Sequence, residues 1–162
     1  MGNPYLKSMT FRILLNSTVT PLGDDIEGRV ISFLVRIGYL PENRTIENYK
    51  ESVPYKLFMD CFVRRREKLW EVEALESYLG TSRATLYRHL NRLKSLGIIE
   101  ETTLNSEDTG NIHKGYKLRF GNLSWAWNFT EAFMEGIIKQ YRKEVDKIQE
   151  MIEMQQSAPE DT

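Results

Sequence analysis

The stretch from Leu69 to Glu101, LWEVEALESYLGTSRATLYRHLNRLKSLGIIEE, decides the fold of this 162-residue chain. Its first apolar residues recur at helical spacing and predict a short helix that Gly80 ends. After a tight turn, Ser82 is a good N-cap for a second helix, which covers about residues 82–95 and stops at Gly97. The β-branched residues that follow predict a strand. This stretch therefore predicts two helices joined by a tight turn, with a strand directly after them.

The flanking sequence adds one helix before this stretch and completes a hairpin after it. Apolar residues between Leu57 and Phe62 predict a helix that ends near the three arginines 64–66. Those cations suit the negative end of a helix dipole, and we favour that role over contact with DNA. Residues 104–114 predict a loop, and Tyr116 to Phe120 alternate between apolar and basic side chains, as a half-buried strand does.

The segment 69–101 resembles the helix-turn-helix of winged-helix transcription regulators, most closely the MarR, ArsR and TrmB-type groups. The resemblance extends over about residues 54–120. It implies a mainly α-helical fold with a small β-hairpin wing, and a homodimer that binds double-stranded DNA and regulates transcription. The residues that match are Leu75, Leu79, Gly80, Ser82, Thr85, Leu86, Arg88, His89, Leu90, Leu93 and Leu96 to Ile99.

The second helix of this pair has two chemically different sides. At 100° per residue, Leu86, Leu90 and Leu93 fall in one narrow sector, and Arg88 and Asn91 fall opposite them. Residues 81–99 contain no Asp or Glu but include four basic residues and one histidine. Such a helix suits the major groove of a duplex, although a charged helix face is also often only solvated.

Arg and Asn bond bidentately to guanine and adenine, so Arg88 and Asn91 are the predicted base contacts. The other predicted DNA contacts on this helix, mainly to phosphate, are Ser82, Arg83, Thr85, Tyr87 and Arg92. On the wing we predict contacts from Lys114 and Lys117, with His113 beside them.

The wing and His89 leave alternatives open. Glu107 and Asp108 lie in the wing loop and would repel phosphate, so a merely solvated hairpin tip is an equal alternative. His89 lies at the edge of the apolar sector and is expected to pack or to lie near phosphate, not to act as a sensor.

Composition excludes several other classes of protein. One cysteine, Cys61, cannot form a disulfide within the chain, and with two histidines it cannot build the usual zinc site. No nucleotide-binding or hydrolase motif is present, so we expect no enzyme, no cofactor and no metal. Cys61 lies on an apolar face and is expected to pack. Without a secretory signal or a membrane-length apolar run, a cytoplasmic protein with no membrane partner is expected.

The N-terminal part is the least informative. Residues 10–20 predict a short strand or the end of a helix. After Asp24 and Asp25, which suit an N-cap, apolar residues from Ile26 to Ile37 predict a helix that Gly38 stops. The predicted organisation is an N-terminal helical extension (1–53), a winged helix-turn-helix DNA-binding domain (54–122), a C-terminal dimerisation helix (123–156) and a disordered tail (157–162).

The C-terminal part predicts one long helix, roughly residues 130–156, with a heptad seam. We favour dimerisation through this seam over packing on its own domain, because the helix is too long for a compact domain of this size. The aromatic residues Trp125, Trp127, Phe129 and Phe133 are expected to pack in the core, although they could also line a pocket for a small-molecule effector. The seam consists of Met134, Ile138, Tyr141, Val145, Ile148 and Ile152.

A second function remains open at this point. Winged helices also serve as protein–protein interaction modules without DNA binding, and the acidic C-terminal part, with four basic and eight acidic residues after residue 120, suits a protein partner. The middle part, residues 54–120, has instead a net charge of +3.

Overall fold

The computed structural model describes residues 12–17, 22–105, 107 and 110–159. These residues divide into two units, one that ends at Trp127 and one that starts at Asn128. Among the described helices, none has both the length and the apolar character needed to cross a bilayer.

Short helices open the first unit. The Asp25 side chain caps the first of them by accepting a 3.0 Å hydrogen bond from the backbone N–H of Gly28. The helix ends beside Gly38, whose φ of 81° only glycine adopts easily. Both ends were predicted, but residues 12–17, expected as a strand or helix end, are irregular. The elements are α1 (Ile26–Arg36), α2 (Ile46–Glu51), α3 (Val53–Lys56) and the π-helix η2 (Leu57–Val63).

The helix-turn-helix follows the prediction closely. Helix α4 (Val72–Leu79) ends at Gly80, which has a φ of 60°. Helix α5 (Arg83–Ser95) begins after Ser82, whose hydroxyl accepts a hydrogen bond from the backbone N–H of Thr85. Because these boundaries depend on local capping chemistry, the sequence alone was sufficient to place them.

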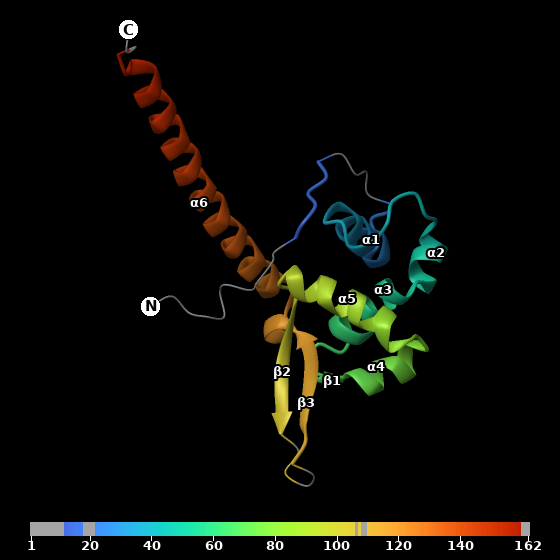
Figure 1. Cartoon of the computed structure of the whole chain (residues 1–162). Coiled ribbons are helices and arrows are strands. Elements are labelled where there is room, and N and C mark those ends of the chain that lie inside the picture. The colour runs from blue at the N-terminus through green and yellow to red at the C-terminus, as the bar shows by residue number, and fades with distance from the viewer. Residues whose placement is uncertain (1–11, 18–21, 106, 108–109, 160–162) are drawn as a thin grey trace. The chain divides into compact units, whose positions relative to one another are not determined.

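Three strands form an antiparallel sheet in the order β1–β3–β2 (Figure 1). Strand β2 (Ile99–Asn105) and strand β3 (Ile112–Leu118) form the predicted hairpin, and their pairing shortens the loop that was expected at residues 104–114. Strand β1 (Trp70–Glu71) pairs with Tyr116 and Gly115 of β3. It was not predicted, because two residues are too few to show an alternating pattern.

The expected strand residue Phe120 lies outside the sheet. Strand β3 ends at Leu118, and Arg119 then bonds to the start of the hairpin through its backbone N–H, which donates to the Ile98 carbonyl. Phe120 follows in the 3-10 turn η3 (Arg119–Gly121) with a φ of 60° and is 54% exposed. The turn redirects the chain, so the alternation of the strand does not continue.

All of these elements share one core in the first unit, a winged-helix fold. Residues before position 54 contribute to it as well as the helix-turn-helix and the sheet. Its fully buried members include Ile31, Leu34, Leu57, Phe58, Phe62, Leu75, Leu86, Leu90, Leu93, Leu96 and Ile99.

The long helix α6 (Leu123–Ser157) starts earlier than expected. The Asn122 side chain accepts a 3.0 Å hydrogen bond from the backbone N–H of Trp125 and so caps a helix that was predicted from about residue 130. With 35 residues, α6 is about 52 Å long. Ser157 is its last residue, and residues 160–162 of the predicted tail lie outside the described part of the chain.

The aromatic residues expected in the core differ in burial. Trp125 is 60% exposed, contrary to the prediction. Trp127 is half-buried and makes an edge-to-face contact with Phe33, with 5.3 Å between ring centroids. Phe129 and Phe133 are also half-buried, and from Ile138 to the end of the described chain every residue is exposed.

Candidate nucleic-acid interface

Helix α5 presents a polar outer side to solvent. Its three leucines at positions 86, 90 and 93 are completely buried, and this fixes the rotation of the helix about its axis. Arg88 and Asn91 consequently point away from the core and are exposed. Neither side chain makes a hydrogen bond or ion pair with the part of the chain that the structure describes. Both are therefore available to a partner.

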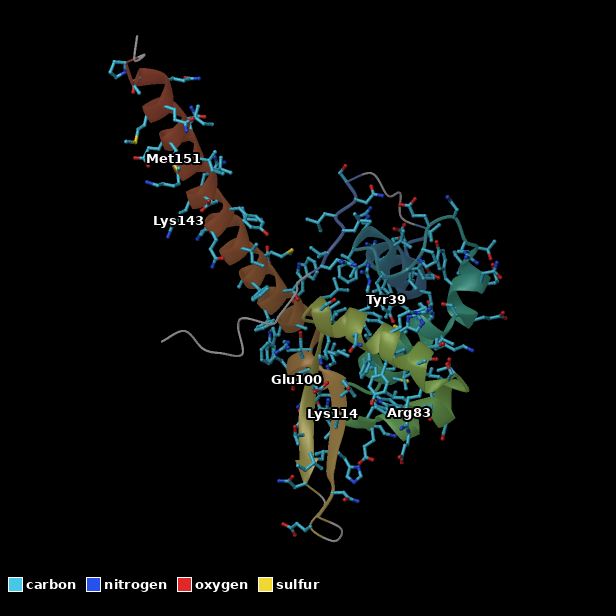
Figure 2. The ribbon with its side chains drawn as sticks, in the orientation of Figure 1. Tyr39, Arg83, Glu100, Lys114, Lys143 and Met151 are labelled. Atoms are coloured by element: carbon cyan, nitrogen blue, oxygen red, sulfur yellow. The ribbon has the colours of Figure 1, made fainter. Side chains whose placement is uncertain are left out.

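One flank of α5 faces the wing across an open hollow of about 310 Å³. Arg83 and Tyr87 from α5 and Lys114 from β3 line it together, although the two elements are far apart in sequence. Figure 2 labels Arg83 and Lys114. The hollow therefore unites three of the predicted DNA contacts. The full lining is Glu71, Val72, Glu73, Arg83, Tyr87, Ile112, His113 and Lys114.

Acidic residues of α4 bind the first arginine of α5, which the sequence analysis did not anticipate. The Arg83 guanidinium donates a hydrogen bond to the Glu76 carboxylate, and it lies 3.9 Å from a carboxylate oxygen of Glu73. These pairs lower the positive charge available to a phosphate. In the sequence, the one sign of these ion pairs is the presence of carboxylates just before the turn. Their partners could not be predicted, because ion pairs across a turn have no fixed residue spacing.

The two wing lysines point to opposite faces of the hairpin, because side chains alternate along a strand and the residues are three apart. Lys114 lies on the face of the α5 hollow, 3.7 Å from Glu101. Lys117 pairs across the strands with Glu100 at 3.3 Å. The structure thus brings Lys114 to α5 but places Lys117 elsewhere.

Glu101 is the acidic centre of a small network beside α5. Burial is the largest influence and raises the pKa of its carboxyl, but hydrogen bonds from Lys94 and Tyr116 together with the charges of Lys94 and Lys114 hold that pKa below its usual value. The Lys94 ammonium donates at 2.9 Å. The network ties the C-terminal part of α5 to the hairpin, so it orients the wing relative to the helix.

The other flank of α5 packs against the segment that follows α1. The Arg92 guanidinium donates a hydrogen bond to the Gly38 carbonyl. His89 meets the Tyr39 ring edge-on, with 6.4 Å between centroids. Burial, followed by the charge of Arg88, lowers the pKa of His89. His89 is therefore a packing residue, and Arg92 is partly engaged by the protein itself.

The start of α5 is held by its own cap. Ser82 Oγ lies 3.0 Å from the hydroxyl of Thr85 and also accepts from the Thr85 backbone N–H. Both hydroxyls lie at the helix N-terminus, where exposed N–H groups and the helix dipole favour phosphate. Their predicted phosphate contacts are compatible with this position.

Cys61, which is the one cysteine of the chain, is a packing residue. Cys61 is completely buried, and burial raises the pKa of its thiol to about 12, so it is protonated and unreactive at neutral pH. In the described part of the chain, no three His, Cys, Asp or Glu side chains are grouped in a way that could hold a metal ion.

Comparison with known proteins gives little further information. No protein-family model and no curated protein matches the chain. A solved structure from Methanosarcina mazei Go1, described as a possible transcriptional regulator, is similar over 64% of this chain and 88% of its own length. The sequence identity is 15% and the TM-score is 0.40, which is too low to carry an argument.

Proposed function

We propose that this chain binds double-stranded DNA in a sequence-specific manner and regulates transcription. The observation that carries the proposal is the pair Arg88 and Asn91 on the second helix of a helix-turn-helix, which points outward and has no hydrogen bond or ion pair with the described residues. An α-helix of this kind fits the major groove, where arginine reads guanine and asparagine reads adenine. We assign phosphate contacts to Thr85 and Ser82 at the helix start and to Lys114 beside the hollow.

The proposal includes a homodimer formed through α6. Five seam residues that are 42–69% exposed follow one heptad pattern along the helix: Ile138, Tyr141, Val145, Ile148 and Ile152. The sixth, Met134, is half-buried. A repeat of this kind is self-complementary, so a second copy of the same helix is the occupant that fits it. Two copies of α5 would then read the two halves of a pseudo-palindromic site.

The test begins with selection of bound fragments from a random pool of duplex DNA, which also yields the site. Affinity for the selected site is then measured by fluorescence anisotropy at several salt concentrations. We expect Arg88→Ala and Asn91→Ala each to weaken specific binding by about 1–3 kcal/mol. The native protein should show a steep loss of affinity with salt, because bound counterions are released from the DNA.

Arg44→Ala is the matched control, since Arg44 is exposed in the loop before α2 and lies outside the α5 surface. It should leave affinity for the site nearly unchanged. Unaltered affinity in both Arg88→Ala and Asn91→Ala would reject the assignment of these two residues as base contacts.

A protein-binding module is the second candidate. It is favoured by the ion pairs that neutralise Arg83, Lys114 and Lys117, three of the predicted DNA contacts. The two candidates differ in their response to polyanions. If α5 binds DNA, Arg88→Ala should elute from heparin at lower salt than the native protein, whereas in the protein-binding module this substitution should leave the elution unchanged.

A further inference from the structure

The arginines 64–66 were expected to complement the dipole of the preceding helix and not to contact DNA. In the structure the turn after η2 also forms a basic surface that the proposed function does not use. Residues 64–68 read RRREK, and all five are exposed. Together they line a hollow of about 350 Å³, to which no other described residue contributes. Four cations and one carboxylate thus surround one open space.

Two of these four cations, Arg65 and Lys68, are held by aromatic rings and not by carboxylates. The Lys68 ammonium lies 3.9 Å from the centroid of the Trp70 ring. The Arg65 guanidinium lies 4.8 Å from the Tyr78 ring centroid and 5.6 Å from that of Trp70. A ring orders a cation but leaves its charge in place, so an anion can still bind there.

Arg64 is different, because it pairs with Asp60 at 2.8 Å and with Glu27 at 3.5 Å. Arg66 has no ion pair with the described residues. The available charge of the turn therefore comes from Arg65, Arg66 and Lys68.

The platform under the turn is rigid. Trp70 is only 2% exposed, and its indole N–H donates a 2.8 Å hydrogen bond to the Cys61 carbonyl. Its backbone pairs with Tyr116 in the sheet. The cations consequently rest on a fixed ring, which reduces the entropy lost when an anion binds.

The turn lies at the end of the sheet opposite the wing tip. Strand β3 runs from Ile112 near the tip to Leu118, and β1 is antiparallel to it, so the chain before Trp70 leads away from the tip. Consistent with this, Glu67 lies beside Gly121, just after β3. In the described part of the chain, the ion pairs and ring contacts of the turn involve no residue of α5.

We propose that the turn Arg64–Lys68 is a second phosphate-binding site, and that it binds the backbone of a second DNA duplex while α5 holds the first. The partner is a polyanion, because all five residues that line the hollow are charged and four of them are cations. Arginine forks match phosphate geometry, and short Lys/Arg-rich runs are typical of nucleic-acid surfaces. The bridging rests on the proposed function, because α5 must hold the first duplex.

The experiment measures bridging by the full-length protein. A biotinylated duplex with the selected site is immobilised and loaded with protein, and a fluorescent duplex of unrelated sequence is then added at low salt. The test variant is Arg66→Gln/Lys68→Gln, which leaves the ring contacts of Arg65 intact. The control variant Arg44→Gln/Lys50→Gln removes the same charge from exposed positions elsewhere.

We expect the test variant to load on the immobilised duplex like the native protein but to capture about tenfold less of the second duplex. The control should capture as much as the native protein. The proposal is overturned if the test variant captures the second duplex normally, if the control loses as much, or if poly-glutamate binds the turn in preference to DNA.

A separate measurement distinguishes failure of the proposed function. If the protein does not load on any selected site, anisotropy with the unrelated duplex alone still reports on the turn. Weaker binding by the test variant than by the control then supports the phosphate site and rejects only bridging. Equal binding by both variants rejects the phosphate site.

Discussion

At the scale of single residues, His89 links the charge state of the protein to the packing of α5. Its ring lies between α5 and Tyr39, where burial and the neighbouring Arg88 both disfavour the protonated form. The pKa of His89 in the folded chain is therefore below the value of about 6.5 that applies to an unfolded chain. The unfolded chain takes up a proton at a higher pH than the folded chain does.

This difference predicts a pH-dependent stability. Above pH of about 6.5 His89 is neutral in both states and its contribution is fully present; as pH falls below that value, protonation of the unfolded chain lowers the free energy of unfolding. His89→Gln should remove the part of the acid-induced decrease in the free energy of unfolding that His89 causes. Urea unfolding at pH 7.5 and 5.5 would measure it.

His113→Gln is the matched control, because His113 is exposed on the wing. It should retain the pH dependence of the native protein. An equal decline in the native protein and in His89→Gln would show that other groups cause the acid sensitivity.

At the scale of elements, the Gly80 turn sets the geometry of the helix-turn-helix. The backbone there has a φ of 60°, and a Cβ added at this position would meet nothing within 4 Å. The requirement for glycine is thus one of backbone conformation alone, with no contribution from crowding.

Because only the backbone conformation requires glycine at position 80, different substitutions there should destabilise the protein to different degrees. Gly80→Asn should destabilise the protein only slightly, because asparagine tolerates the left-handed region, whereas Gly80→Val should cost about 1–2 kcal/mol or more. Thermal or urea unfolding measures both. Equal losses would mean that the side chain at position 80 is crowded and that this description of the turn is wrong.

Elements were predictable from sequence where local chemistry decides them. The Ser82 cap and the glycine stops at positions 38, 80 and 97 fix helix ends through hydrogen bonds and dihedral angles within a few residues. Strand β1 and the reversal at Phe120 were missed, because both depend on pairing with distant segments. The early start of α6 was a missed signal, since Asn122 is a normal N-cap.

The candidate site was predictable in part for the same reason. The outward orientation of Arg88 and Asn91 follows from the leucine spacing of α5 itself. The partners of Arg83 and Arg92, by contrast, come from α4 and from the segment after α1, and no periodicity indicates them. That Lys114 and Lys117 lie on opposite faces of the hairpin can be predicted from the strand register alone, provided that the strand itself is correctly placed.

At the scale of the whole molecule, α6 is the helix whose apolar side chains would remain exposed to solvent in a monomer. A helix with exposed Ile138, Val145 and Ile152 along one side gains little from its own chain, and covering that side would stabilise a pair of helices.

We therefore expect Val145→Glu to shift the protein from dimer to monomer, because it places two like charges in the middle of the seam. Analytical ultracentrifugation over a range of concentrations would measure the change. Lys143→Glu, at an exposed position two residues away and off the seam, should leave the dimer intact. A native protein that sediments as a monomer throughout would contradict the proposed pairing.

Because the Lys68 ammonium contacts the Trp70 ring, the fluorescence of Trp70 responds to what binds at the turn. Indole emission responds to a nearby charge, and helix α5 contains no tryptophan. An anion that draws the Lys68 ammonium away from the ring would alter the fluorescence of Trp70, whereas a duplex in contact with α5 alone would leave this residue undisturbed. Because Trp125 and Trp127 also emit, occupancy of the turn is followed in unlabelled protein as a change in the Trp70 part of the total indole emission.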